Sequence, residues 1–573
     1  MAQPRTGAAR AYDPSPCYVP VGGTVVSGWD AVAAAVPEAT RVVAVDGPAA
    51  LDWDRVILHL AAALDRRGRG VDLADMRRHF HPWGSILEVT RPRELPDDPD
   101  FAPLATVEMR ALLASLPTLR CGPGRVGLVA GPGAALAPHD SLWYLDVPKR
   151  YAEAAMADGT GRNLGQPQEA GPGSAKRLFF TDWPVIDRHR DAIAPRVDQW
   201  IDAQQIDRPT ALEGSSLRRT LGRLATMPFR TRPTFNSTPW GGHWGQRVLG
   251  VNPGAPNTAL GYELIAPEAG ALLGTPGCAV EIPLQLISSQ HAEALLGPWV
   301  RSQFGSSFPI RFDYLDTLDG GNLSVHCHPR QEFMTRFFGW PYTQHESYYV
   351  MVAGPGSKVF LGLRSGVDLD AFHAAANASA RHLQPLDIDD YVQCFRAVPH
   401  QLFMIPAGTP HGSGVGNVIL EVSATPYLYS LRFYDWLRRD ARDRLRPVHI
   451  DHAFDNLDTQ RSGEAVPRDL VQHPTVLRSG PGWREERLGS LPEVFFEVRR
   501  LALREGHRAP DRTDDRFHVL NVVEGDGAVI VPAAGPSHLV NYAETIVVPA
   551  AVGSYELQSL GSGPVRVVKA LVR

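Results

Sequence analysis

The chain has 573 residues, of which 44% are hydrophobic and 21% charged, proportions typical of a globular protein with about three or four domains. Its formal net charge of −5 excludes the broad basic surface that nucleic-acid binding requires, so we expect no nucleic-acid partner. The five cysteines are scattered without a CxxC pair, and no run of 18 apolar residues occurs. These features predict a soluble, cytoplasmic protein with no membrane partner and no disulfide framework.

The first part of the chain predicts an α/β domain over residues 23–205, preceded by a flexible tail over residues 1–22. A short β-branched strand begins at Arg41, a turn follows at Gly47-Pro48, and the next residues carry apolar side chains at helical spacing. Further buried strands are expected at 126–130 and 141–147. Strands that alternate with helices indicate a parallel sheet covered by helices.

The character of the sequence changes after Arg232-Pro233. Short alternating strands broken by glycine and proline continue to about residue 430, with one helical insert expected near 368–396. A polar stretch around 459–467 precedes a last β-rich segment. The pattern predicts two all-β domains of the sandwich or jelly-roll type, over residues 215–450 and 470–573.

Two histidine motifs in the first all-β segment predict a metal site. His326 and His328 stand two residues apart on an expected strand, so their side chains share one face. The segment Pro406-Ala-Gly-Thr-Pro-His411 supplies a third histidine directly after a turn. An HxH motif followed by PxGxxH is the pair of half-motifs with which cupin barrels assemble metal ligands. A lone buried histidine needs no metal, but three in these motifs favour one.

A carboxylate is expected to complete the ligand set, and two candidates are present. Glu332 follows the HxH motif closely, whereas Glu346 begins the expected strand that contains Tyr348 and Tyr349. We favour Glu346 because of this strand position, and Glu332 stays as the alternative.

Several further motifs accompany the histidines in a fixed order. They are Pro239-Trp240-Gly241-Gly242, Leu323–Pro329, Glu346 with Tyr348-Tyr349, Pro406–His411, Leu420-Glu421, Tyr429–Trp436 and Arg446–Ile450. In these motifs the chain resembles the class I mannose-6-phosphate isomerases, a family of zinc-dependent cupins. The resemblance extends over residues 239–450.

The resemblance implies an enzyme that interconverts mannose 6-phosphate and fructose 6-phosphate, or a related sugar phosphate, with one zinc ion per chain. The zinc ligands would be His326, His328, Glu346 and His411. Ser324 and Arg432 would line the sugar-phosphate pocket, and Glu421 would carry the proton between C1 and C2 of the sugar. Arg432 suits phosphate binding because the planar guanidinium group of arginine binds two phosphate oxygens at once.

Two residues depart from the family pattern. His326 replaces the glutamine that is usual among the zinc ligands, and Gly321 replaces a lysine found in many members. A set of three histidines and one glutamate also resembles the metal sites of cupin oxygenases. The missing lysine leaves open a sugar-phosphate sensor or scaffold without turnover.

The expected α/β domain resembles the P-loop kinases of the uridine-kinase type. The stretch from Gly47 lies where the phosphate-binding loop belongs, but Asp52, Trp53 and Asp54 occupy the positions of glycine, lysine and the hydroxyl residue. Two carboxylates would repel phosphate, so we interpret the domain as a degenerate kinase fold and expect no ATP binding. An unrelated α/β domain is the alternative.

The last segment has the strand–EGxG–strand form of a second cupin, with Glu524-Gly525-Asp526-Gly527 at its turn. His518 has no partner histidine two residues away, so no metal is assigned there. We expect this domain to pack against the first cupin.

Overall fold

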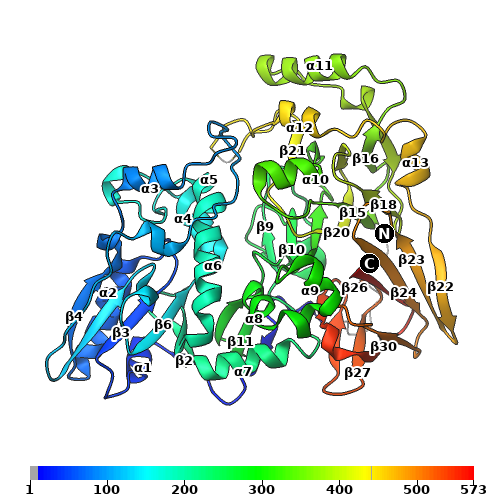
Figure 1. The fold of residues 1–573 in the computed structure, drawn as a ribbon. Coiled ribbons are helices and arrows are strands. Elements are labelled where there is room, and N and C mark those ends of the chain that lie inside the picture. Colours follow the sequence, from blue (N-terminus) through cyan, green and yellow to red (C-terminus); the bar gives the residue numbers. More distant parts are fainter. Residues whose placement is uncertain (1–10, 441) are drawn as a thin grey trace.

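The protein is described by a computed structural model that covers residues 11–440 and 442–573. A mixed α/β part, a central two-sheet β-sandwich and a C-terminal two-sheet β-sandwich follow one another along the chain (Figure 1). The predicted α/β part and the two predicted all-β parts are therefore confirmed as classes of structure. Among the described residues no helix combines the length and the apolarity needed to cross a membrane.

The α/β part is built on a seven-stranded sheet. The order is β2 (Val26–Ser27), β8 (Thr210–Glu213), β7 (Gln199–Asp202), β6 (Ser141–Asp146), β3 (Val42–Asp46), β5 (Arg125–Ala130) and β4 (Gly70–Asp75). Strands β3 to β7 pair in parallel, whereas β8 and β2 add antiparallel pairs at one edge. Every residue of β3 is buried, as expected for a central strand with helices on both faces.

Helices surround this sheet and extend beyond the predicted boundary at residue 205. They include α1 (Trp29–Ala34), α2 (Trp53–Arg66), α3 (Trp83–Val89), α4 (Lys149–Ala157), α5 (Ala175–Arg177), α6 (Trp183–Ile193) and α7 (Gly214–Leu224). Because β8 pairs with β7 and α7 follows β8 directly, the chain leaves the α/β part only after residue 224.

Residues 11–22 do not form the flexible tail that the sequence suggested, and residues 1–10 lie outside the described residues. Strand β1 (Cys17–Tyr18) pairs in parallel with β11 (Gly270–Thr275), which pairs in turn with β12 (Cys278–Pro283). Tyr12 is buried and donates a hydrogen bond to Glu263. Long-range pairing of this kind has no signal in the local sequence.

The central sandwich has a six-stranded and a five-stranded sheet. The first runs β18 (Leu402–Ile405), β15 (Glu346–Ala353), β20 (Asn417–Ala424), β13 (Ile310–Asp316), β10 (Leu260–Leu264) and β9 (Thr234–Asn236). The second runs β17 (Val392–Arg396), β16 (Lys358–Leu363), β19 (His411–Ser413), β14 (Val325–Cys327) and β21 (Leu431–Tyr434). Both sheets are antiparallel, as a jelly roll requires.

The helical insert predicted near 368–396 is shorter than expected, because α11 spans Leu369–His382 and strand β17 occupies the end of the range. Two helices that were not predicted, α8 (Leu284–Leu296) and α9 (Pro298–Phe304), also interrupt the sandwich. The apolar run in α8 resembles a buried strand in the sequence, and periodicity alone does not separate the two. Short helices α10 (Gln331–Phe333), α12 (Ile450–Asn456) and α13 (Ala465–Asp469) complete this part.

The C-terminal sandwich packs against the central one. Its six-stranded sheet runs β22 (Thr475–Gly480), β23 (Trp483–Gly489), β24 (Phe496–Leu503), β31 (Val565–Val572), β26 (His518–Glu524) and β29 (Thr545–Val548). Its four-stranded sheet runs β25 (Arg508–Arg512), β30 (Ser554–Leu560), β27 (Gly527–Pro532) and β28 (His538–Asn541). The Tyr314 hydroxyl donates to the carbonyl of Ala543 at 2.7 Å and accepts from Asn521 at 2.6 Å. His518 lies 2.8 Å from the hydroxyl of Tyr555.

Candidate metal centre

Four side chains converge between the two sheets of the central sandwich. His326 and His411 come from β14 and β19, His328 follows β14, and Glu346 begins β15. Their ligand atoms all lie within 4.8 Å of one another, and all four residues are buried. The structure thus brings together the four predicted ligands, whereas Glu332 is exposed on α10.

Each histidine is oriented by a backbone carbonyl. The Nδ1 atoms of His326, His328 and His411 lie 3.0, 3.2 and 2.9 Å from the carbonyl oxygens of Ser324, Tyr429 and Thr409. A carbonyl oxygen only accepts, so Nδ1 carries the proton in all three rings. The Nε2 atoms are then free to bind a metal ion, an arrangement common around protein metal sites.

The contacts of Glu346 indicate that a cation belongs in this cluster. Its two carboxylate oxygens lie 2.9 Å from His328 Nε2 and 3.1 Å from His411 Nε2. With Nδ1 protonated, a neutral imidazole presents a lone pair to an oxygen that is also an acceptor. The 2.9 Å approach is not aligned as a hydrogen bond, and among the described residues His328 Nε2 has no hydrogen-bond partner.

Burial makes a protonated imidazole a poor source of this cation. Burial, followed by the charges of the other histidines, lowers the pKa of His326 well below its usual value. Burial also lowers the pKa of His328 despite the nearby Glu346. Three neutral nitrogens and one carboxylate form a donor set that fits zinc or iron in its coordination number and chemistry.

A buried acid–base group lies beside the four ligands. Strand register places Glu421 opposite both Asp313 and Tyr348, so these side chains share the inner face with Glu346. Arg311 forms an ion pair with Glu421 and lies 3.3 Å from Glu346. Burial, followed by Asp313 and Glu346, raises the pKa of Glu421 well above its usual value.

Sequence reasoning identified Glu421 but missed Arg311 and Asp313. The signal was present, because the two charged residues alternate with apolar ones in the strand Ile310–Asp316 and point to one face. Arginine and aspartate are rarely buried without partners, so this alternation could have indicated a polar site inside the sandwich.

The predicted sugar-phosphate residues lie near the same cluster. The Ser324 hydroxyl is buried, 3.3 Å from His326 Nδ1. Arg432 is the register partner of His326, next to a β-bulge, and its Nη1 donates to the carbonyl of Pro447 at 3.1 Å. Arg432 does not pair with Glu421, which contacts Arg311 instead.

The α/β part contributes a segment to the surroundings of this site. Residues 95–105, which we call the strap, cross onto the central sandwich. The ring of Phe101 lies 6.4 Å from Tyr429 and 4.8 Å from His449, and Phe180 of the α/β part lies 6.1 Å from Tyr429. The carboxylate of Asp98 pairs with His452 at 2.6 Å. The strap therefore supports the residue whose carbonyl orients His328.

Comparisons with known proteins agree with this division of the chain. A family described as a domain of unknown function (DUF8485) matches residues 28–226. Mannose-6-phosphate isomerase of Streptococcus mutans is 28% identical over 250 residues, which cover 42% of this chain and 72% of that protein. Mannose-6-phosphate isomerase ManA of Bacillus subtilis is 23% identical over 314 residues, which cover 54% of this chain and 89% of that protein.

Solved structures of similar proteins include a mannose 6-phosphate isomerase from Bacillus subtilis, with a TM-score of 0.49, 16% identity and coverage of 60% of this chain and 99% of that one. A zinc-bound mannose 6-phosphate isomerase has a TM-score of 0.45 and 16% identity, over 60% of this chain and 98% of that one. At these identities the activity of this chain has to be argued from its own site.

We expect His328→Ala or His411→Ala to lose most of the bound metal, because each variant removes one of four ligands. His326→Gln should retain metal, since an amide oxygen can still coordinate. Metal content of the purified variants, measured by inductively coupled plasma mass spectrometry, checks both expectations. Unchanged metal content in the two alanine variants would contradict the assignment.

The strap makes a second prediction about the same ion. Phe101→Ala should weaken metal affinity by up to roughly tenfold. The variant removes a ring that packs against Tyr429, whose carbonyl orients the metal ligand His328. Phe80→Ala is the matched control, since that ring packs against the cluster of Ile86 and Met109 inside the α/β part. Competition with a chelator measures both variants. Equal affinities would show that the strap does not act on the site.

Proposed function

We propose that the protein is an aldose–ketose isomerase that interconverts mannose 6-phosphate and fructose 6-phosphate, or a related sugar phosphate, with one zinc ion held by His326, His328, Glu346 and His411. The observation that carries this proposal is the convergence of these four ligands beside the buried pair of Glu421 and Arg311. The likeness to proteins named mannose-6-phosphate isomerase supports it.

The isomerisation moves one proton between neighbouring carbons, C1 and C2. Glu421 would accept the proton at a carboxylate oxygen from one carbon and return it to the other. Arg311 holds that carboxylate in place, and the Arg311 Nε also donates to the Ser423 hydroxyl at 2.6 Å. When bound, zinc would act as a Lewis acid towards the substrate oxygens.

Three arginines are suited to hold the phosphate. Arg438 and Arg446 lie 3.1 and 3.2 Å from the two carboxylate oxygens of Asp435. Arg432 lies near enough for the charges of Arg446 and Asp435 to shift its pKa. Burial, followed by Arg446, lowers the pKa of Arg432 to about 10, so its guanidinium stays charged at neutral pH. Among the described residues, Arg432 Nε and Arg446 Nη1 are buried without a hydrogen-bond partner. Three cations around one carboxylate favour an anionic ligand.

Arg438 offers a positive charge in place of the family lysine, whose sequence position Gly321 occupies here. A Cβ added at Gly321 would lie 3.2 Å from Arg438 Nη2, so the guanidinium occupies the space next to this glycine. The same Nη2 donates to the carbonyl of Asn322. We infer that a positive charge is retained here from a different position in the sequence.

The α/β part is proposed to be a P-loop-like fold without nucleotide binding. Strand β3, the loop over residues 47–52 and helix α2 form the required strand–loop–helix unit. The Asp52 carboxylate accepts from the backbone N–H of Arg55 at 3.1 Å, and the Trp53 indole is buried and donates to the carbonyl of Pro48 at 3.0 Å. These contacts support the proposal, because the Asp52 carboxylate takes a backbone donor that a phosphate oxygen would use and the Trp53 indole stands where the lysine of a working loop would be.

The kinetic test separates proton transfer from phosphate binding. Arg432→Ala and Arg438→Ala should each lower kcat/KM by roughly 10²-fold, whereas Glu421→Gln should lower kcat with little change in KM. Arg432→Lys should recover only part of the loss, because a point charge does not reproduce the fork. Steady-state kinetics on the best of several hexose and pentose phosphates gives these values.

Two results would contradict the proposal. Near-normal kcat/KM in both arginine-to-alanine variants would place the phosphate elsewhere. If the parent protein turns over no sugar phosphate with its full metal content, the isomerase function is wrong. Binding of metal and sugar phosphate without turnover would favour a sensor.

We expect no measurable binding or hydrolysis of ATP, because the N–H groups of Trp53 and Arg55 are already occupied and the carboxylates of Asp52 and Asp54 would repel phosphate. Isothermal titration calorimetry with ATP and Mg²⁺ checks this expectation. Micromolar binding that is lost in Trp53→Ala would show that the loop is functional.

A further inference from the structure

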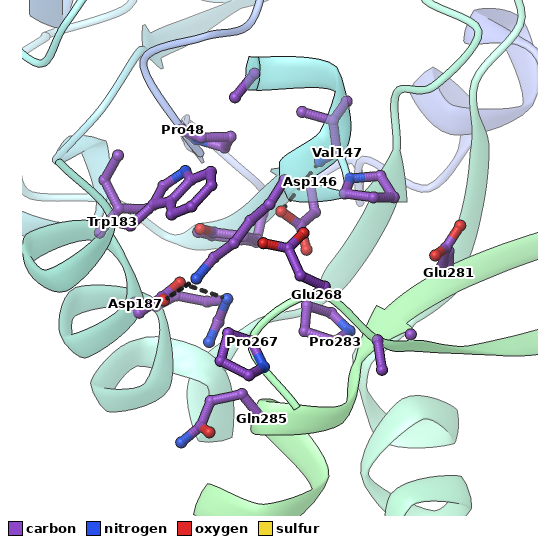
Figure 2. Close-up of a pocket in the computed structure, with 18 residues that line it drawn as sticks. Pro48, Asp146, Val147, Trp183, Asp187, Pro267, Glu268, Glu281, Pro283 and Gln285 are labelled. Atoms are coloured by element: carbon purple, nitrogen blue, oxygen red, sulfur yellow. Dashed lines mark hydrogen bonds and ion pairs between the residues drawn. The ribbon is translucent and has the colours of Figure 1, made fainter. Parts of the chain in front are cut away.

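A cavity lies between the α/β part and the strands β11 and β12, and none of the four metal ligands lines it. Figure 2 shows Asp146, Trp183 and Asp187 on the wall formed by the α/β part. Pro267, Glu268, Pro283 and Gln285 form the opposite wall. The cavity thus joins two parts of the chain, which end at Arg190 and resume at Pro267 in the sequence.

The cavity lies where doubly wound α/β proteins bind their ligands. The connection from β3 leads to β4 on one side of the sheet, whereas the connection from β6 leads to β7 on the other side. The strand order therefore reverses between the parallel neighbours β3 and β6, and such switch points form crevices at the carboxyl ends of the strands. Pro48 follows β3, and Asp146 is the last residue of β6.

Both cations that line the cavity are already neutralised. Lys149 and Arg190 pair with Asp187 at 2.8 and 2.9 Å, and Arg190 also pairs with Asp191 at 2.8 Å. On the other side, Glu281 is paired at 2.7 and 2.8 Å with the guanidiniums of Arg150 and Arg232. Among the described acids that line the cavity, Asp146 and Glu268 have no ion pair at 4.0 Å or less.

The buried carboxylate of Asp146 has fewer hydrogen-bond donors and countercharges around it than a buried charge requires. Its side chain is 7% exposed, yet its only described hydrogen bond comes from the backbone N–H of Val147 at 3.0 Å. The second oxygen has no partner in the described part of the chain, and Figure 2 shows the carboxylate directed into the cavity. Burial raises the pKa of Asp146 to about 8, which reflects the missing countercharge.

Glu268 faces Asp146 from the opposite wall. One of its oxygens accepts from the hydroxyl of Tyr427, and the structure gives no partner for the other among its described residues. Burial raises the pKa of Glu268 as well, against the effect of Lys149. The free volume of about 50 Å³ exceeds the roughly 10–15 Å³ that a single water requires, so a group of several atoms fits.

We propose that this cavity is a binding site for a small organic amine, whose ammonium group would lie between Asp146 and Glu268. An ammonium group supplies up to three donors and one positive charge, which these acceptors lack. An anionic ligand would meet two uncompensated carboxylates. A metal ion is disfavoured, because the four residues of the central sandwich are the only group with metal-ligand spacing in the described residues.

The site is independent of the isomerase proposal, so it is tested by binding and not by turnover. The probes are ethanolamine and 1,4-diaminobutane, each compared with its neutral counterpart, ethylene glycol or 1,4-butanediol. Thermal unfolding of the full-length, metal-loaded protein is followed at about pH 8.5, where Asp146 is largely ionised and the amines are still charged. At least one amine should raise the unfolding temperature in a saturable manner, and its neutral counterpart should not.

Variants locate the site. Asp146→Asn should raise the Kd of the amine roughly tenfold or more, because it removes the buried countercharge. Glu268→Gln should act in the same direction and serves if Asp146→Asn does not fold. Asp158→Asn, an exposed acid just beyond the end of α4, is the control and should bind like the parent.

Three outcomes would overturn the proposal. The first is that neither amine produces a saturable shift. The second is that the neutral counterparts bind as well as the amines, which would indicate a hydroxyl-binding cavity. The third is an unchanged Kd in both Asp146→Asn and Glu268→Gln, which would place the amine elsewhere.

Discussion

Three hydrogen bonds from histidine rings to backbone carbonyls determine what the central sandwich can do. Without the carbonyls of Ser324, Thr409 and Tyr429, each imidazole could rotate or change tautomer, and Nε2 would not converge on Glu346. Two of these carbonyls lie two residues before the histidine they orient. The geometry of the strands and of the turn before β19 therefore sets the orientation, and the surrounding β-sheets keep it fixed.

The third carbonyl connects the site to the rest of the protein. Tyr429 belongs to a loop before β21, and its ring is packed by Phe101 and Phe180 of the α/β part and by Phe338 of the sandwich. Its hydroxyl accepts from the Trp340 indole at 2.7 Å. The α/β part can therefore affect the proposed metal centre through this packing, whatever its own loop binds. Such packing gives a physical reason for retaining the domain even if, as we propose, the loop beside Asp52 and Trp53 binds no nucleotide.

The sequence allowed the ligands to be predicted because they follow local rules. A period of two places His326 and His328 on one face, and the turn residues around Gly408 place His411 at the start of the next strand. Arg311 and Asp313 alternate with apolar residues, which marks a polar face, but the sequence does not show that this face lies across from Glu421. The pairing of β1 with β11 and the path of the strap depend on contacts between residues hundreds of positions apart, and local patterns contain no information about these contacts.

The charges in the two polar regions of the chain differ in a way that the overall charge of −5 conceals. Around Asp435, two arginines share one carboxylate, Arg432 lies nearby, and buried guanidinium nitrogens lack partners among the described residues. Around Asp187, every cation is paired, and Asp146 is left with a single backbone donor. Because desolvated charges are costly when uncompensated, each region favours a ligand of the opposite sign. We therefore propose an anion site beside the four metal ligands and a cation site at the boundary of the α/β part. The two sites share no residue, so a substitution in one leaves the side chains of the other unchanged.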